Sequence, residues 1–228
     1  MKIVFTPDWF LNNDLLIEVV SFFVLITFFF LAIKGYKINK KKSLLYLGVG
    51  FLLVALGELA TILTKIVLYY DTTITREIGQ TIITYQVVKT VDIFYNIGFF
   101  FQKILTLLGF YLIYKIPSKK IVSGDSLLVF NLIVIVALLG SAWYFTYHIT
   151  ALLIIFLIIN NYYKTYVKEK ISNQKILIAA FGLLALSQII FLFSQIDYFY
   201  VIAQSMQLIS YITLFALVVK ILKNGKKT

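Results

Sequence analysis

The chain has 228 residues, of which 61% are apolar and 14% charged, and its mean hydropathy is +0.94. Soluble domains are about half apolar and a quarter charged, so this composition excludes an ordinary water-soluble globular protein. The absence of cysteine excludes disulfides, thiolate metal sites and thiol nucleophiles. The lone histidine, His148, leaves too few ligands for a zinc site, so we expect it to be an interfacial polar residue and expect no metal or other cofactor.

Apolar stretches long enough to cross about 30 Å of hydrocarbon recur along the whole chain. The first contains Asp14 and Glu18 where a signal peptide needs an unbroken apolar core, so we expect it to be retained. Neither proline falls inside a stretch, so no helix should carry a proline kink. The prediction is an all-α integral membrane protein with a single seven-helix transmembrane domain over 1–228. In chain order its helices are 11–33, 44–69, 93–115, 125–144, 147–163, 174–194 and 199–222.

Basic residues gather on alternate connections between these helices. Lys2, Arg76 and Lys89 fall on the opposite connections, while Lys65 and Lys103 lie within spans. Because cytoplasmic loops hold the excess of Lys and Arg, we predict a cell-membrane protein with an extracellular N-terminus and a cytoplasmic C-terminus. This face suits anionic lipid headgroups, which explains the formal charge of +11 without a nucleic-acid partner. The sixteen cytoplasmic residues, of 21 in all, are Lys34, Lys37, Lys40, Lys41, Lys42, Lys115, Lys119, Lys120, Lys164, Lys168, Lys170, Lys175, Lys220, Lys223, Lys226 and Lys227.

Aromatic residues fall at both predicted membrane boundaries, as interfacial belts do. The outer belt is predicted to hold Trp9, Tyr69, Tyr70, Trp143, Tyr144, Tyr198 and Tyr200, and the inner belt Tyr36, Tyr114, Tyr162, Tyr163 and Tyr166.

The connection 71–92 differs in kind from the others. It is rich in Thr, Ile and Val in an alternating pattern and has Gly79 near its middle. This pattern predicts a short extracellular β-hairpin between the second and third helices.

Two blocks of the chain align with later blocks, which indicates an internal duplication. Residues 92–116 match 197–221 without gaps, with ten identities in 25 positions, and residues 34–56 match 164–186. The two offsets, 105 and 130, differ by about the length of the hairpin segment. We therefore predict a 3+1+3 parallel duplication, which places a pseudo-two-fold axis along the membrane normal. The first three-helix repeat covers 11–116, the linker helix 125–144 and the second repeat 147–222.

The 3+1+3 plan resembles that of SWEET sugar transporters. With its outside N-terminus and the predicted hairpin, it is also similar to microbial rhodopsins. Both resemblances concern architecture alone. Neither proline precedes a glutamine, so the Pro-Gln loop motif is missing, and the middle of the last helix carries Gln204 and Gln207 where a retinal-binding lysine is required. No activity follows from either resemblance.

Five polar residues on four helices fall at one predicted depth and form what we call the polar layer. Glu58 and Lys103 lie about 20 Å from the cytoplasmic boundary, so we expect them to form an ion pair. Glu58, Thr61 and Lys65 share one helix face. One hypothesis is that the layer binds a small polar ligand or ion; the other is that it only holds the helices together. Its members are Glu58, Gln102, Lys103, Gln188 and Gln207.

Two further expectations concern packing. Asp14 and Glu18 lie near the outer end of the first helix, so we expect them to be solvated. Small residues let transmembrane helices approach closely, and we assign this role to Gly48, Gly50, Gly57, Gly98, Gly109 and Gly182.

No H-E-x-x-H, G-x-S-x-G or phosphate-binding glycine motif occurs, so we do not expect an enzyme. The repeat and the polar layer favour a small carrier or channel for a polar solute or ion. The alternative is a receptor-like membrane sensor or partner subunit, which neither transports nor catalyses and which binds a membrane partner protein.

Overall fold

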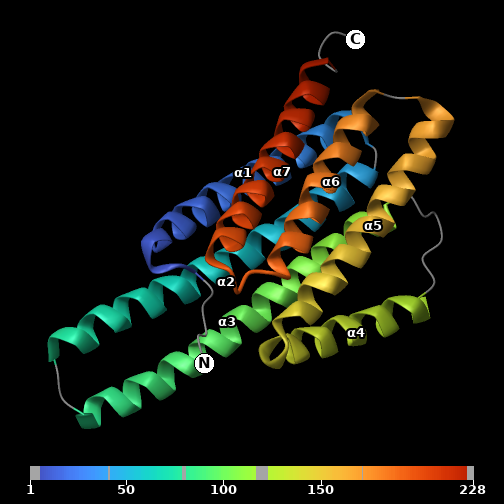
Figure 1. Ribbon diagram of the computed structural model, residues 1–228. Helices are drawn as coiled ribbons and strands as arrows, with labels where there is room; N and C mark the ends of the chain where they lie inside the picture. The colour runs from blue at the N-terminus through green and yellow to red at the C-terminus, as the bar shows by residue number, and fades with distance from the viewer. Residues whose placement is uncertain (1–5, 41, 79–80, 117–122, 171, 225–228) are drawn as a thin grey trace.

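The computed structural model describes residues 6–40, 42–78, 81–116, 123–170 and 172–224, and it is helical throughout (Figure 1). The predicted all-α class is confirmed. A short 3-10 helix, η1 (Asp8–Phe10), precedes seven α-helices in this part of the chain. These are α1 (Asn13–Asn39), α2 (Lys42–Ile78), α3 (Thr81–Lys115), α4 (Ser123–Ala142), α5 (Tyr144–Glu169), α6 (Ser172–Phe191) and α7 (Asp197–Asn224).

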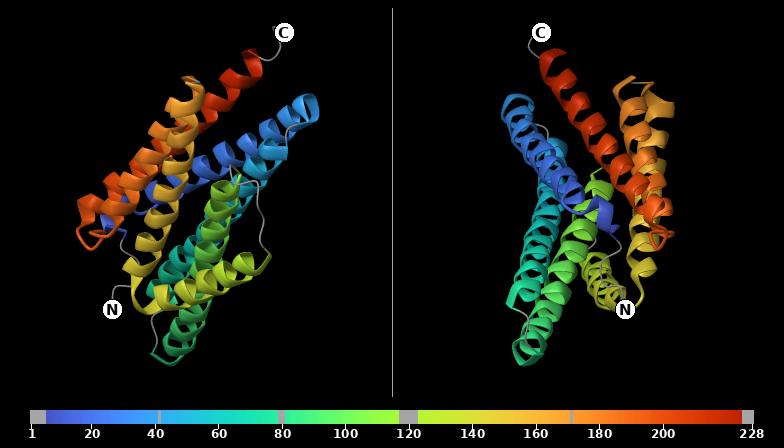
Figure 2. Two further views of the ribbon diagram at one scale, coloured as in Figure 1. Left: turned by 90° about the vertical axis from the view of Figure 1, so that its right-hand side faces the viewer. Right: turned by 60° about the vertical axis from the view of Figure 1, so that its left-hand side comes forward.

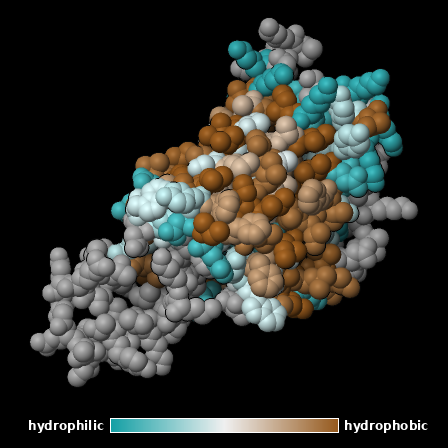
Figure 3. Space-filling view, viewed as in Figure 1, coloured by the Kyte–Doolittle hydropathy of each residue, from teal (hydrophilic) through white to brown (hydrophobic). Residues whose placement is uncertain are grey.

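The helices are those of a multi-pass membrane protein. Among the described residues, six helices contain a stretch long and apolar enough to cross a membrane, and α4 is the exception. Its apolar stretch is Leu127–Gly140, about 21 Å long at 1.5 Å per residue. Large apolar side chains such as Phe23, Phe30 and Leu153 are more than half exposed, and apolar surface covers much of the face shown in Figure 3. Of the seven predicted spans, six therefore have the length and composition of a transmembrane helix.

Six of the seven helices pack as a closed ring. α1 packs on α2, α2 on α3, α3 on α5, α5 on α6 and α6 on α7, and α7 returns to α1. Aromatic side chains fill part of the interior: the ring centroids of Phe28 and Phe51 are 4.2 Å apart, and Phe181 stacks 6.5 Å from Phe51. All three are fully buried. The segments α1–α3 and α5–α7 thus meet at two seams, α1/α7 and α3/α5.

Helix α4 lies outside this ring and crosses its neighbours obliquely (Figures 1 and 2). Its main contacts are with α3 and α5. Those two helices run in the same direction along the bundle (Figure 1). The segment between them must therefore carry the chain back from one end to the other, and α4 makes most of that return.

Helices α1 and α5 end in the same way. Lys40 and Lys170 both adopt a left-handed backbone, with φ of 52° and 50°. The backbone N–H of each donates a 2.7 Å hydrogen bond to the carbonyl four residues earlier, that of Tyr36 and of Tyr166. A left-handed residue ends a helix while satisfying one of its last carbonyls. The next helix then begins two residues later in both places.

The helices that follow also correspond. Residues 51–60 of α2 and 181–190 of α6 have the same order of buried, half-buried and exposed positions. Ten consecutive positions thus have the same degree of burial in two segments that lie 130 residues apart.

The β-hairpin predicted over 71–92 is wrong. Residues 71–78 continue α2 and 81–92 begin α3, whereas residues 79–80 lie outside the described ranges, in which no strand occurs. Thr, Ile and Val oppose helix by only about half a kcal/mol each, and extending a formed helix costs far less than starting a new element. The two long helices therefore continue as a helical hairpin beyond the ring (Figure 1).

Glycines bring α2 and α3 close together, as predicted. A Cβ on Gly109 would lie 2.6 Å from the carbonyl oxygen of Gly50, and a Cβ on Gly57 would lie 2.6 Å from Thr106 Oγ1. The same prediction is wrong for Gly182 on α6, where nothing lies within 4 Å of the added atom. The pair α2/α3 thus has its backbones nearly in contact.

This contrast predicts the effect of two glycine substitutions. Gly109→Ala should destabilise the bundle by about 1–3 kcal/mol, because its methyl group meets backbone that cannot rotate away. Gly182→Ala is the matched control and should be neutral or stabilising by up to about 1 kcal/mol, since alanine is the better helix former. Thermal unfolding in one detergent compares them. Equal Tm values would contradict the close α2/α3 contact.

Candidate functional site

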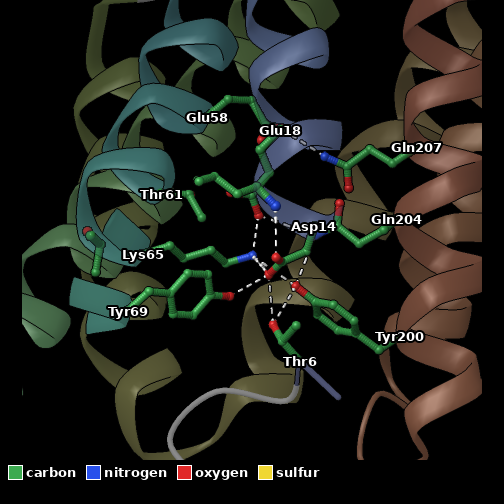
Figure 4. Close-up of polar contacts among 12 residues, drawn as sticks. Thr6, Asp14, Glu18, Glu58, Thr61, Lys65, Tyr69, Tyr200, Gln204 and Gln207 are labelled. Carbon is green, nitrogen blue, oxygen red and sulfur yellow. Dashed lines mark hydrogen bonds and ion pairs between the residues drawn. The ribbon is translucent and has the colours of Figure 1, made fainter. Parts of the chain in front are cut away.

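Lys65 of α2 lies at the centre of a buried group of charged side chains (Figure 4). Its Nζ is 2.7 Å from Asp14 Oδ2 and also forms an ion pair with Glu18 Oε1, and side-chain exposure is at most 3% for all three residues. The same ammonium donates a 3.0 Å hydrogen bond to Tyr200 Oη on α7. Its three protons therefore join α2 to α1 and α7.

Asp14 has a full set of hydrogen-bond donors. Besides Lys65, Oδ2 accepts hydrogen bonds from Tyr69 Oη at 2.7 Å and Thr6 Oγ1 at 3.0 Å, and Oδ1 accepts one from the backbone N–H of Leu15 at 2.8 Å. A carboxylate surrounded in this way is well suited to remain ionised away from water. Asp14 is therefore a structural partner of Lys65.

Glu18 is less well satisfied. Its Oε1 accepts from Lys65 and, at 3.4 Å, from Gln204 Nε2, which also donates to Tyr200 Oη at 3.2 Å. Its Oε2 is buried and has no hydrogen-bond partner among the residues that the structure describes. Glu18 occupies the position four residues after Asp14, so both carboxylates lie on one face of α1.

Glu58 lies two helical turns from Lys65 along α2, about 10 Å deeper in the bundle. Its Oε1 accepts a 2.8 Å hydrogen bond from Gln207 Nε2 and a 3.3 Å one from Tyr211 Oη, both on α7. The side chain is buried, and no ion pair reaches it from the described residues.

Asp14, Glu18, Glu58 and Lys65 together form what we call the acidic cluster. It places three carboxylates and one ammonium in the interior of the ring, so the acids outnumber the lysine when all are ionised. Leaving an ionised carboxylate in an apolar interior without a partner costs several kcal/mol or more. The cluster therefore requires either protonation or an additional positive charge.

The structure separates the members of the predicted polar layer. Glu58 and Gln207 are hydrogen-bonded to each other, which brings α2 and α7 together. Gln102 instead donates to Tyr147 Oη at 3.2 Å, and Gln188 contacts His148 Nδ1 at 2.9 Å.

The expected ion pair between Glu58 and Lys103 is wrong. Lys103 donates a 2.7 Å hydrogen bond to the carbonyl of Gly140, near the end of α4. Counting residues along the helix predicts how deep Lys103 lies in the membrane. It does not predict which neighbouring helix the side chain faces. The shared face of Glu58, Thr61 and Lys65 is confirmed, since all three are buried.

Sequence reasoning missed the two acids of α1. Asp14 and Glu18 were expected to be solvated, yet they are 0% and 2% exposed. Tyr200 belongs to this site rather than to the outer belt. Trp9 and Tyr198, by contrast, are more than half exposed, as belt residues are. The overlooked signal was Lys65, a lysine buried in the second span that needed acids from another helix.

The comparisons with known proteins add no family. No protein-family description, curated protein or solved structure matches this chain. The acidic cluster must therefore be interpreted from its own geometry.

The cluster predicts that Lys65 is far more important for stability than Lys103. Lys65→Met should cost about 3–5 kcal/mol, because it leaves two buried carboxylates without their cation. Lys103→Met loses one charged hydrogen bond to a carbonyl and should cost less, about 1.5–3 kcal/mol. Thermal unfolding in detergent compares the two.

A triple variant provides the control. Replacing Lys65 by Met together with Asp14→Asn and Glu18→Gln removes both ion pairs of Lys65 along with their charges, and should recover much of the lost stability. Equal losses for the two single lysine variants would contradict the arrangement.

Proposed function

We propose that this protein is a small membrane carrier or channel for a polar solute or ion, with no catalytic activity. The observation that favours this function is the excess of carboxylates over cations inside a ring of apolar helices. Ionisable groups within a membrane are costly and most often belong to substrate or ion pathways. A purely structural role is served best by balanced charges, whereas the acids of this cluster outnumber its lysine when all are ionised.

The arrangement of polar and apolar residues supports a carrier. Polar side chains extend from Thr6 and Tyr69 at one end of the bundle to Glu58 and Tyr211 deeper inside. Beyond them the interior is filled by buried apolar residues around Phe51. A solute that reached Glu58 would meet this apolar barrier, so passage would require the two halves to rearrange, as in alternating access.

We also propose that the bundle is a parallel duplication of α1–α3 and α5–α7. The shared lysine ends of α1 and α5 and the matching burial of 51–60 and 181–190 support it. The ring supports it too, because exchanging the halves maps every neighbouring pair of helices onto another neighbouring pair. The acidic cluster lies at one seam between the halves, α1/α7.

The proposed orientation, with the N-terminus outside and the lysine-rich ends in the cytoplasm, has a direct test. The chain has no cysteine, so single-cysteine variants need no background removal. A membrane-impermeant maleimide added to intact cells should label Tyr198→Cys and leave Lys170→Cys unlabelled until the cells are opened. Both positions are exposed. The reverse pattern would show the opposite orientation, and equal labelling would place both positions on the outside.

One observation favours the alternative, a sensor or partner subunit. α2 and α3 have 37 and 35 residues, compared with 20 in α6, and their hairpin extends beyond the ring (Figure 1). Such a projection offers a surface for another membrane protein. Stable co-purification of one protein without ion flux would support this alternative.

Reconstitution tests the carrier. Liposomes that contain the protein and are loaded with a dye sensitive to H⁺, Na⁺ or K⁺ should dissipate an imposed gradient of that ion faster than liposomes without the protein. Glu58→Gln should reduce this rate at least tenfold, because the amide preserves the shape of the side chain and removes its charge. Asp197→Asn, at an exposed acid in the first turn of α7, is the matched control and should retain the flux. Correctly inserted protein without flux would contradict the proposal.

A further inference from the structure

Glu18 and Glu58 are the two carboxylates of the acidic cluster that Lys65 does not fully neutralise. Lys65 makes ion pairs with Asp14 and Glu18, and one lysine balances one of these acids. Glu58 has hydrogen-bond donors but no ion pair among the described residues. Glu18 retains a buried oxygen, Oε2, for which the described part of the chain provides no hydrogen-bond partner.

The two side chains lie close enough to interact. Figure 4 shows Glu18 and Glu58 next to each other above Lys65, with Gln204 and Gln207 entering from α7. Two negative carboxylates in such an interior repel each other strongly, because little solvent screens them. This arrangement is stable only when a positive charge lies between them or one carboxylate is protonated.

The corresponding positions in the second half show that this spacing brings side chains together. At an offset of 130, Glu18 corresponds to His148 and Glu58 to Gln188. His148 Nδ1 and Gln188 Oε1 form a direct hydrogen bond of 2.9 Å. A hydrogen bond therefore links α5 and α6 at this position. The corresponding residues of α1 and α2 are two acids, which can be linked only through a cation or a shared proton.

We propose that Glu18 and Glu58 bind one small exchangeable monovalent cation, either a proton or an alkali metal ion. The described residues contain no group of three or more His, Cys, Asp or Glu that could hold a metal ion. The two glutamates also lack the nitrogen and sulfur ligands that transition metals prefer. Carboxylate and amide oxygens suit hard cations. This inference deepens the proposed function by naming the class of its ion.

Other ionisable groups surround this pair. Asp14 and Lys65 lie beside Glu18, Tyr200 and Tyr211 approach from α7, and Tyr147 of α5 acts electrostatically with Glu58. Asp14 and Lys65 are paired with each other. Tyr211 donates a hydrogen bond to Glu58, whereas Tyr200 accepts one from Lys65 and Tyr147 accepts one from Gln102. The two glutamates therefore supply two negative charges, one of which the bound monovalent cation would neutralise.

Thermal unfolding tests for an alkali ion on purified full-length protein. In choline chloride buffer at constant ionic strength, Li⁺, Na⁺ and K⁺ are titrated separately. Above its Kd, the ion that binds should raise Tm by about 3–5 °C for each tenfold increase in concentration. Glu58→Gln and Glu18→Gln should lose this shift, while Asp197→Asn keeps it. In the wild type, the shift should weaken as the pH falls, because protons compete for the site.

Infrared spectroscopy tests for a proton. If a proton is the ion, the wild type should show the carbonyl band of a protonated carboxylic acid at neutral pH, and Glu58→Gln should lose it. Either the alkali-dependent shift or this band supports the site and identifies its occupant. If the wild type shows neither the shift nor the band, the inference is overturned. This outcome does not depend on whether the variants fold.

These measurements need no transport, so they separate the two proposals. Cation binding without flux would contradict the carrier function and support the cation site. Flux through a protein that shows no cation binding would support the carrier function and contradict the cation site.

Discussion

The fold depends on one buried lysine. Lys65 is the point at which α1, α2 and α7 are joined by charge, through Asp14, Glu18 and Tyr200. Helices in a membrane gain little from apolar contact with each other, because lipid is equally apolar, so polar contacts and close packing hold them together. Close packing performs this task between α2 and α3, and Lys65 performs it at the seam where the last helix returns to the first. The closed ring therefore depends on a contact that also creates the acidic cluster.

The two halves of the ring divide their chemistry unequally. At an offset of 130 residues, the positions of Asp14, Glu18, Glu58 and Lys65 are occupied by Tyr144, His148, Gln188 and Gln195. The charges thus lie in one half, while in the other half Tyr144 donates to the carbonyl of Leu192 and His148 bonds to Gln188. If the halves arose by duplication, charge was gained or lost on one side only. The cation site that we propose would then have an uncharged structural counterpart in the second half.

Hydropathy predicted the helices well. The transfer of apolar side chains from water is a large and additive effect, so six spans could be located to within a few residues. The hairpin prediction over 71–92 failed because strand propensity is weak compared with the ease of extending α2 and α3. The fourth helix was found in sequence, but its oblique path depends on packing against α3 and α5, which no local pattern encodes.

The site was harder to predict than the fold. Depth along a helix follows from counting, and it placed Glu58 and Gln207 at one level correctly. The neighbour that a side chain faces depends on how the helices pack, which counting does not reveal. For this reason Lys103 was paired with Glu58, whereas it contacts Gly140 of α4. The burial of Asp14 and Glu18 follows only once α1 is known to pack between α2 and α7.

A density map of the protein in a lipid nanodisc would show where the Lys65 side chain lies. We expect Lys65 Nζ between Asp14 and Glu18, inside a ring closed by α1 and α7. Asp14 and Glu18 turned towards lipid or water, with Lys65 paired elsewhere, would contradict this arrangement.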